Sequence, residues 1–153
     1  MSGTRPLVVV MHGVNLDQLG RRDPAQYGSL TLAQLEGEIA AEADALGLAV
    51  RFFHTDHEGE FVERLHALRD EGADAVLLNP GAWTHYAWAI RDALEIAALP
   101  AAEVHLSDVK RREPWRRLSV IEELCVVSVS GRGSSGYGDA LRTLAAQLGG
   151  AER

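Results

Sequence analysis

The sequence has few of the residues that several large classes of protein require. Among its 153 residues there is one cysteine, Cys125, which excludes an intrachain disulfide and a cysteine-cluster metal site. No apolar run approaches the roughly 20 residues of a membrane-spanning helix, and the N-terminus shows no signal-peptide pattern. Basic residues are not in excess: the net charge of −7 and the pI near 5.3 argue against a nucleic-acid-binding surface. We therefore expect a cytoplasmic protein that contacts neither a membrane nor nucleic acid.

The residues that are present suit an ordinary globular domain. The chain is 46% hydrophobic and 24% charged, and its length allows one core that buries roughly 68–70% of the unfolded surface. Apolar runs that alternate with helical patterns predict a parallel sheet covered on both faces. The expected fold is a single flavodoxin-like α/β domain over residues 1–153 with strand order 2-1-3-4-5. The five predicted strands cover 7–11, 48–53, 75–78, 101–106 and 124–129.

The connections between these strands predict four helices and two irregular segments. Helices are expected from Thr31 to Gly47, where Thr31 and Gln34 have capping-box spacing, and over 58–70 with Asp56 as the cap. Two more are expected over 84–98, capped by Thr84, and over 136–148. The segment 110–117 has too few apolar positions for a long helix. The loop after the first strand runs to about Ser29, longer than the usual 2–6 residues, and we interpret about 16–29 as an active-site lid.

Polar residues follow three strands that lie side by side in this topology. Ligands of parallel sheets bind outside the carboxyl ends of the strands, so these residues are candidates for one site. They are His12 and Asn15, then Asn79 and Gly81, then His105 and Ser107.

Two pairs of residues are candidates for the chemistry of this site, one for proton transfer and one for ligand binding. Glu103 and His105 are two apart on a strand and share a face, so the carboxylate can fix the tautomer of the imidazole, as a proton donor requires. The alternative is a pair that only stabilises the end of the sheet. His85 and Asp92 are seven apart and are expected on one helix face, with His85 in the first turn, where backbone amides favour an anionic group. Their alternative is an exposed face with two incidental polar residues.

The predicted lid carries Arg21, Arg22 and Tyr27. An unperturbed tyrosine is almost entirely neutral near pH 7, and a neighbouring guanidinium favours the phenolate, which is a base. On spacing alone, an arginine and a tyrosine in one loop are usually a surface stacking pair.

Other functions fit the sequence less well. Gly131–Gly136 matches a dinucleotide-binding pattern but follows the last strand, so we interpret it as a turn that lets the final helix pack closely. A receiver domain needs an acidic pair after the first strand and a lysine after the fifth, and a flavodoxin needs a hydroxyl-rich loop after the first strand. Neither pattern is present. Asp56, His57, Glu58 and Glu60 lack a second histidine at ligand spacing, so we predict no metal site there.

Over nearly its whole length the chain resembles the type II 3-dehydroquinate dehydratases (3-dehydroquinases). No single motif carries this resemblance, but their order and spacing together are highly specific. The motifs are 12–16 (His-Gly-Val-Asn-Leu), 19–28, 57–60 (His-Glu-Gly-Glu), 79–85 (Asn-Pro-Gly-Ala-Trp-Thr-His), 90–92, 103–107 (Glu-Val-His-Leu-Ser), Arg112-Glu113, Arg116 and 133–137.

The resemblance implies a reaction and a role for each matching residue. The reaction is the anti elimination of water from 3-dehydroquinate through an enolate, giving 3-dehydroshikimate, with no cofactor, metal or Schiff base. Tyr27 would remove the C2 proton with the help of Arg22, and His105, oriented by Glu103, would protonate the departing hydroxyl. Asn15 would hold a water against the enolate oxygen. The substrate-binding candidates are Asn79, Gly81, His85, Asp92 and Arg116, with the backbone amides of Leu106 and Ser107 for the substrate carboxylate.

The resemblance also implies an assembly and a pathway. It implies a homo-oligomer of trimers assembled into a dodecamer, in which a neighbouring chain helps to close each site. The pathway would be the shikimate route to aromatic amino acids or the breakdown of quinate. The sequence departs from the family where Asn-Gly-Pro-Asn becomes His12-Gly-Val-Asn15, and where Asp108 replaces a common Asn. The alternative function is an altered homologue that binds a hydroxylated cyclic acid or serves as an oligomeric scaffold.

Overall fold

The computed structural model describes residues 4–151, and its centre is one all-parallel sheet. The strands are joined in the order β2-β1-β3-β4-β5, which confirms the predicted flavodoxin-like topology. The winding reverses between the neighbours β1 and β3, and a ligand crevice forms at such a switch point. The strands are β1 (Leu7–His12), β2 (Ala49–His54), β3 (Ala75–Asn79), β4 (Ala101–His105) and β5 (Val127–Ser130).

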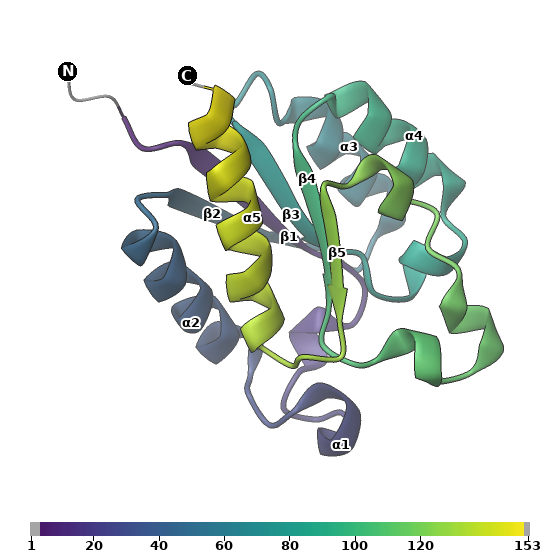
Figure 1. Cartoon of the computed structure of the whole chain (residues 1–153). Helices are drawn as coiled ribbons and strands as arrows, with labels where there is room; N and C mark the ends of the chain where they lie inside the picture. Colours follow the sequence, from purple (N-terminus) through teal and green to yellow (C-terminus); the bar gives the residue numbers. More distant parts are fainter. Residues whose placement is uncertain (1–3, 152–153) are drawn as a thin grey trace.

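Two helices cover each face of the sheet (Figure 1). Alternate residues of β1 enter different cores: Val8 and Val10 pack toward α2 and α5, whereas Val9 and Met11 pack toward α3 and α4. A strand that is buried on both faces has a continuous apolar run, which is why β1 was recognisable in the sequence. The helices are α2 (Leu32–Ala45), α3 (Glu58–Ala67), α4 (Trp88–Ala97) and α5 (Ser135–Ala151). None of the helices within residues 4–151 is long and apolar enough to cross a membrane.

Helix α2 begins and ends as its sequence predicts. The Thr31 hydroxyl accepts a hydrogen bond from the Gln34 N–H at 3.2 Å, and the Gln34 side chain accepts one from the Thr31 N–H at 2.9 Å. This reciprocal pair is a capping box. Gly47 follows the helix with φ of 75°, a left-handed conformation that ends helices.

The predicted cap of α3 is wrong. The residue at the N-cap is His57, which makes no side-chain capping bond. The carboxylate of Asp56 instead accepts the backbone N–H of Asn15 at 2.8 Å. The sequence pattern did not show this because Asn15 is distant in the chain. The helix also ends at Ala67, three residues before the predicted Asp70.

The single helix predicted from Thr84 to Ala98 is two elements. A 3₁₀ helix, η2 (Gly81–His85), is followed by Tyr86 and Ala87 in non-helical conformations, and α4 begins at Trp88. Thr84 is not a helix cap, because its hydroxyl hydrogen-bonds the buried carboxylate of Glu103. His85 is therefore the last residue of a 3₁₀ helix and not part of the first turn of α4. The prediction that His85 shares a helix face with Asp92 is wrong for the same reason.

The loop after β1 is built from two short helices, η1 (Leu16–Gln18) and α1 (Pro24–Tyr27). Leu16 and Leu19 are buried in the core beneath the loop. The carboxylate of Asp23 accepts the Ala25 N–H at 3.0 Å and so caps α1. These contacts give Tyr27 a defined position next to the carboxyl end of the sheet.

The helical elements of the chain between β4 and β5 are all 3₁₀ turns, and the predicted absence of a long helix over 110–117 is confirmed. These are η3 (Val109–Arg111), η4 (Pro114–Arg117) and η5 (Glu122–Leu124). Strand β5 begins at Val127, three residues later than predicted. A Cβ added to Gly136 would lie 3.2 Å from a methyl group of Val129, so the glycine supports the close packing predicted for the final helix.

Candidate active site

A pocket lies at the carboxyl ends of β1, β3 and β4, beneath the loop that carries α1. Leu106, Ser107 and Val109 form part of its wall, immediately after β4. Glu103 lies behind His105, and Asp92 lies elsewhere on the exposed surface of α4. The pocket thus brings together most of the predicted site residues: Asn15, Arg22, Tyr27, Asn79, Gly81, His85, His105, Leu106, Ser107 and Arg116.

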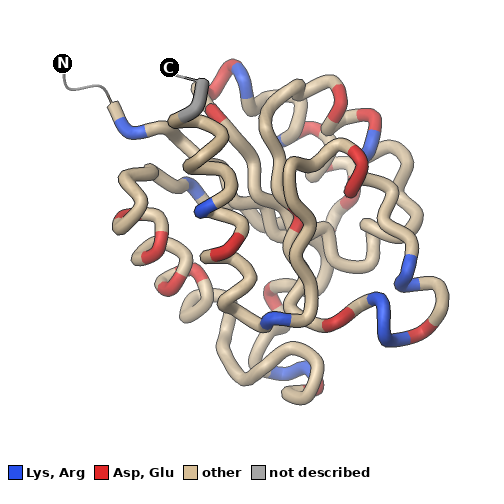
Figure 2. Tube along the Cα trace, viewed as in Figure 1, with Lys and Arg blue, Asp and Glu red and all other residues tan. Residues whose placement is uncertain are grey.

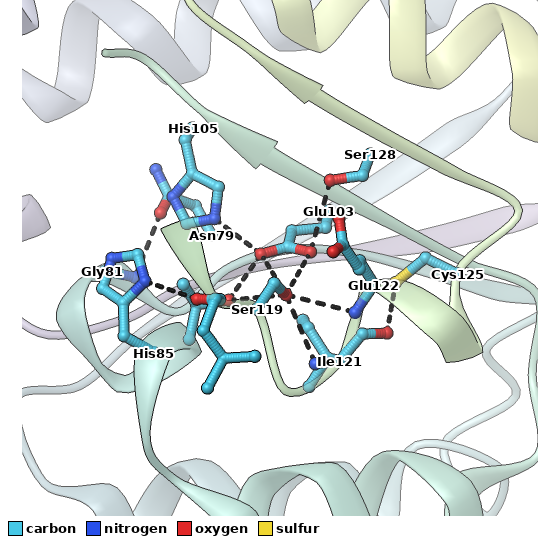
Figure 3. A network of polar contacts seen from close by, with 12 residues as sticks. Asn79, Gly81, His85, Glu103, His105, Ser119, Ile121, Glu122, Cys125 and Ser128 are labelled. Carbon is cyan, nitrogen blue, oxygen red and sulfur yellow. Dashed lines mark hydrogen bonds and ion pairs between the residues drawn. The ribbon is translucent and has the colours of Figure 1, made fainter. Parts of the chain in front are cut away.

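Glu103 and His105 form a buried, directly hydrogen-bonded pair. The Nε2 of His105 lies 2.6 Å from Oε2 of Glu103, whose side chain is fully buried (Figure 3). Burial alone raises the pKa of the Glu103 carboxyl. The hydrogen bond and charge of His105, with the Thr84 and Ser119 hydroxyls, outweigh burial and hold that pKa below its usual value. A carboxylate at this position makes Nε2 the protonated nitrogen and leaves Nδ1 for a substrate.

His85 is the second buried histidine of the pocket. Its Nδ1 donates a hydrogen bond to the carbonyl of Leu118 at 2.7 Å. Burial lowers the pKa of His85, and the nearby charges of His105 and Arg116 add to this, although the Leu118 hydrogen bond opposes it. The ring is therefore neutral near pH 7, and its Nε2 is an acceptor. The His85 and His105 rings are stacked, 6.2 Å apart.

Two guanidinium groups hold the phenol oxygen of Tyr27. Arg22 donates from Nη2 at 2.7 Å, and Arg112 donates from Nη1 at 2.6 Å. The Arg22 guanidinium also lies 3.6 Å from the centre of the Tyr27 ring. The predicted pairing of Arg22 with Tyr27 is present, and Arg112 adds a second cation. Two positively charged donors thus meet at one oxygen.

The loops after β1 and β3 pack directly on one another. Asn15 adopts a left-handed conformation with φ of 69°, and its backbone is held by Asp56. The carbonyl oxygen of the Asn79 side chain accepts the Gly81 N–H at 3.0 Å, and its amide group donates to the Tyr137 hydroxyl at 3.3 Å. Gly81 has φ of 66°, and a Cβ there would lie 2.7 Å from the Val14 carbonyl. Gly81 therefore contributes its backbone to the pocket wall, where a side chain would not fit.

Two arginines, Arg22 and Arg116, line the pocket although the chain as a whole is acidic. Figure 2 shows Lys and Arg interspersed with Asp and Glu on the segment after β4 and in the loop after β1, whereas α2 carries Asp and Glu. Arg116 lines the pocket and forms an ion pair with Glu113 at 3.0 Å. Positive charge in a narrow pocket attracts a carboxylate-bearing ligand.

Residue-by-residue reasoning missed three contributors to the site. Arg112 was noted only as part of a motif, Thr84 was predicted to be a helix cap, and Ser119 was not considered. For Arg112 the available signal was a run of arginines close behind the Glu103–His105 strand end. For Thr84 and Ser119 there was a physical signal, since a glutamate inside a buried strand must have hydrogen-bond donors. The sequence does not show which hydroxyls supply them.

One group of side chains in the described part of the chain has the spacing of metal ligands. Its members are Asp17, His54 and Asp56, and His54 Nε2 lies 3.6 and 3.5 Å from the two carboxylates. The sequence analysis considered Asp56 with its neighbours in the chain, so it did not consider His54 or Asp17. The group lies beside the loop after β1, and none of its members lines the pocket.

The fold and the pocket indicate a class of protein without reference to known proteins. A flavodoxin-like sheet with a hydrogen-bonded Glu–His pair and a tyrosine held by two arginines is typical of an enzyme that transfers protons. Sequence comparison gives the family: the family model described as dehydroquinase class II matches residues 6–145 of this chain. The chain belongs to the class II dehydroquinase family.

Individual relatives and solved structures agree. The 3-dehydroquinate dehydratase 2 of Pseudomonas putida is 49% identical over 144 residues, 94% of this chain and 96% of that protein. The 3-dehydroquinate dehydratase of Leptothrix cholodnii is 46% identical over 130 residues, 85% of this chain and 87% of that protein. The crystal structure of the type II dehydroquinase of Propionibacterium acnes superposes with a TM-score of 0.87 at 37% identity, covering 94% of this chain and 99% of that one.

Proposed function

We propose that this chain is a 3-dehydroquinate dehydratase that removes water from 3-dehydroquinate by anti elimination through an enolate, giving 3-dehydroshikimate. Family membership and the names of its relatives support the reaction. The single observation that carries the mechanism is the contact of Tyr27 with Arg22 and Arg112 in the same pocket as His105. A dehydration that starts at a C–H bond next to a ketone needs a base for carbon and an acid for oxygen.

Tyr27 is the proposed base. As a phenolate it takes the proton from C2 of the substrate, and the electron pair moves into the adjacent carbonyl to form the enolate. Arg22 and Arg112 stabilise the phenolate before this step. Once Tyr27 has become neutral, they lie next to the negative charge that has moved to the enolate. Asn15 is proposed to hold a water molecule against the enolate oxygen and so to stabilise the same charge.

His105 is the proposed acid. The enolate collapses to restore the C3 carbonyl, the C1–O bond breaks, and His105 protonates the leaving hydroxyl so that water departs. Glu103 keeps Nε2 protonated and balances the imidazolium charge, which leaves Nδ1 to deliver the proton. Base and acid come from separate elements, the loop after β1 and the end of β4, and an anti elimination requires them to act on opposite faces of the ring.

The remaining candidates are proposed to bind the substrate. His85, with its acceptor nitrogen, and Asn79 and Arg116 suit the ring hydroxyls. The backbone amides of Leu106 and Ser107 suit the carboxylate, and Gly81 allows the loop after β3 to approach. The reaction as written needs neither a metal nor an imine, and Lys110, the only lysine in the sequence, does not line the pocket.

The proposed assembly is a dodecamer built from trimers. Its support is an exposed apolar surface on and before α4, where Tyr86, Trp88 and Ile96 are 58%, 59% and 63% exposed. All three belong to the stretch 86–96 of the chain, and contiguous exposed apolar groups are typical of interaction sites. Asp92 lies on the same helix, outside the pocket of its own chain, so its proposed contact with substrate would occur in the pocket of a neighbouring chain.

The proposed organisation is one catalytic domain over 1–153, with residues of about 16–29 as its lid, working in the cytoplasm. The test of function is direct. Purified protein is mixed with 3-dehydroquinate, and the ultraviolet absorbance of the conjugated enone product is followed, with Tyr27→Phe as the matched control. Absorbance that grows with the wild-type protein and not with Tyr27→Phe supports the proposal. A flat trace with folded wild-type protein refutes it.

A further inference from the structure

We propose that Ser119 is a positioning residue of the acid–base site: its hydroxyl holds Glu103 ionised and aimed at His105. The inference rests on the proposed function, because it assigns Ser119 to the proton donor of that reaction. It extends that function to a residue in the irregular segment between β4 and β5, to which none of the sequence motifs points.

The geometry begins with the carboxylate. Each oxygen of Glu103 has more than one donor, although the side chain has no exposure to solvent. Oε2 is contacted by His105 Nε2 at 2.6 Å, by the Thr84 hydroxyl and by the Ser119 hydroxyl at 3.0 Å. Oε1 is contacted by the Ser119 hydroxyl at 2.8 Å and by the Ser128 hydroxyl at 3.3 Å. Ser119 is the only one of the four partners that contacts both oxygens.

The direction of the Ser119 hydrogen bond follows from its other contacts. A serine hydroxyl has one proton and two acceptor lone pairs. The backbone N–H groups of Ile121 and Glu122 point at the Ser119 oxygen at 3.3 and 3.1 Å, and an N–H can only donate (Figure 3). The lone pairs of the hydroxyl are thereby occupied, so its proton is free for an acceptor, and Glu103 at 2.8 Å is closer than the Thr84 hydroxyl at 3.4 Å. A protonated carboxyl group would need an acceptor, and Ser119 has none to offer.

The ionised state of Glu103 affects His105. A buried carboxylate with four hydrogen-bond partners that can donate to it is stabilised in its ionised form, and the group among them able to balance its charge is the imidazole. Ser119 thus acts on the proposed acid without touching it. The adjoining backbone has a parallel role, because the Leu118 carbonyl accepts the Nδ1–H of His85. Leu118 thus orients His85 through its main chain, and Ser119 orients His105 through the contact of its side chain with Glu103.

The segment that carries Ser119 is itself anchored to the rest of the site. The Val120 N–H donates to the Thr84 carbonyl at 2.8 Å, and Arg91 donates to the Val120 carbonyl at 2.7 Å. The competing explanation is that Ser119 only stabilises the turn before η5 through Ile121 and Glu122. That role predicts a loss of stability on substitution but no change in the protonation of Glu103 and no selective effect on one chemical step.

The experiment compares Ser119→Ala and Ser119→Thr with Ser128→Ala as the matched control. Ser128→Ala also removes a hydroxyl from Glu103, but from the oxygen that does not contact His105. The first readout needs no substrate. Infrared spectra in D₂O, recorded over a pH series, follow the C=O band of protonated Glu103. The band is identified by its absence from the spectra of a protein that carries Glu103→Gln. Ser119→Ala should show this band at higher pH than the wild type or Ser119→Thr.

The second readout separates the chemical steps. Ser119→Ala should form product about tenfold more slowly, the effect of losing one donor to a buried carboxylate. Its exchange of the C2 proton with solvent deuterium should fall less, because His105 acts after the enolate has formed. Ser119→Thr should stay within a fewfold of the wild type on both measures, and Ser128→Ala should lie between the wild type and Ser119→Ala.

Each outcome bears on one claim. An unshifted infrared band in a folded Ser119→Ala variant overturns the inference, as does an equal loss of exchange and dehydration. If Ser119→Ala does not fold, Ser119→Thr, which keeps the hydroxyl, provides the test. A Glu103 band that appears at higher pH in folded Ser119→Thr than in the wild type then overturns the inference. A wild-type protein that shows the expected infrared behaviour but forms no product refutes the proposed function and leaves the contact between Ser119 and Glu103 standing.

Discussion

The phenol oxygen of Tyr27 accepts a hydrogen bond from Arg112 at 2.6 Å across 85 residues of sequence. Tyr27 belongs to the loop after β1, and Arg112 follows β4, so the contact joins the proposed lid to the segment between β4 and β5. Arg112 also donates to the Ser107 hydroxyl at 3.2 Å. The proposed base is therefore completed only when the two segments meet.

Arg112→Ala should reduce turnover by about 10- to 100-fold, as expected when a charged hydrogen bond to the reacting oxygen is lost. The same variant should lose C2 proton exchange to a similar degree, because the base acts in the first step. Arg111→Ala is the matched control, since Arg111 is its neighbour but its side chain is 87% exposed. Steady-state rates and deuterium incorporation check this, and equal activity of the two variants would contradict the role of Arg112.

His12 should make the protein sensitive to mild acid. Its side chain is fully buried, and although Glu36 lies 3.0 Å from Nε2, burial lowers the pKa of His12 to about 4, with the charge of His54 adding to the effect. The unfolded chain takes up this proton near pH 6.5, so between pH 6.5 and 4 acid favours the unfolded state. This histidine alone should cost about 2 kcal/mol of stability between pH 7 and pH 5.

Urea unfolding of wild type and His12→Gln at the two pH values measures this cost. The variant should lose less stability on acidification, whereas substitution of the exposed His66 by Gln should leave the wild-type pH dependence unchanged. A His12→Gln protein with the same pH dependence as the wild type would show that His12 is already paired in the folded state.

Gly81→Ala should destabilise the protein and impair substrate binding together. The left-handed φ costs an alanine roughly 1–2 kcal/mol, and its Cβ would meet the Val14 carbonyl at 2.7 Å, so the two loops must separate. Gly37→Ala is the matched control, because Gly37 lies inside α2 with open space around it and should gain roughly 0.5–1 kcal/mol. Thermal unfolding and KM for both variants test this, and a neutral Gly81→Ala would refute the steric account.

Asp92 should act in a neighbouring chain. Asp92→Ala and Tyr27→Phe should each be nearly inactive alone. When the two are co-expressed as mixed oligomers, some pockets combine Tyr27 from one chain with Asp92 from another. Activity should then rise well above the sum of the separate variants. Mixed oligomers that remain inactive would show that Asp92 has no role in a neighbouring pocket, and a single-chain mass by light scattering would exclude the assembly.

The sequence was sufficient for the sheet because its signals are local. The apolar run of β1 and the capping box at Thr31 depend on neighbours in the chain, and the strand order follows from five alternating units. The incorrect predictions concern residues whose hydrogen-bond partners are distant in the sequence. Thr84 looked like a helix cap but bonds Glu103, and Asp56 looked like a cap but bonds Asn15. Arg112 and Ser119 remained unassigned because only the folded chain brings them to Tyr27 and Glu103.

The central claim is that Tyr27 starts the reaction and His105 completes it. It is tested most directly by measuring deuterium incorporation at C2 beside product formation in D₂O, for wild type, Tyr27→Phe and His105→Ala. Tyr27→Phe should lose both by about 10²–10⁴-fold, the typical worth of one proton-transfer group. His105→Ala should lose product formation while C2 exchange continues in part. If Tyr27→Phe forms product as fast as the wild type, the base lies elsewhere and the account is wrong.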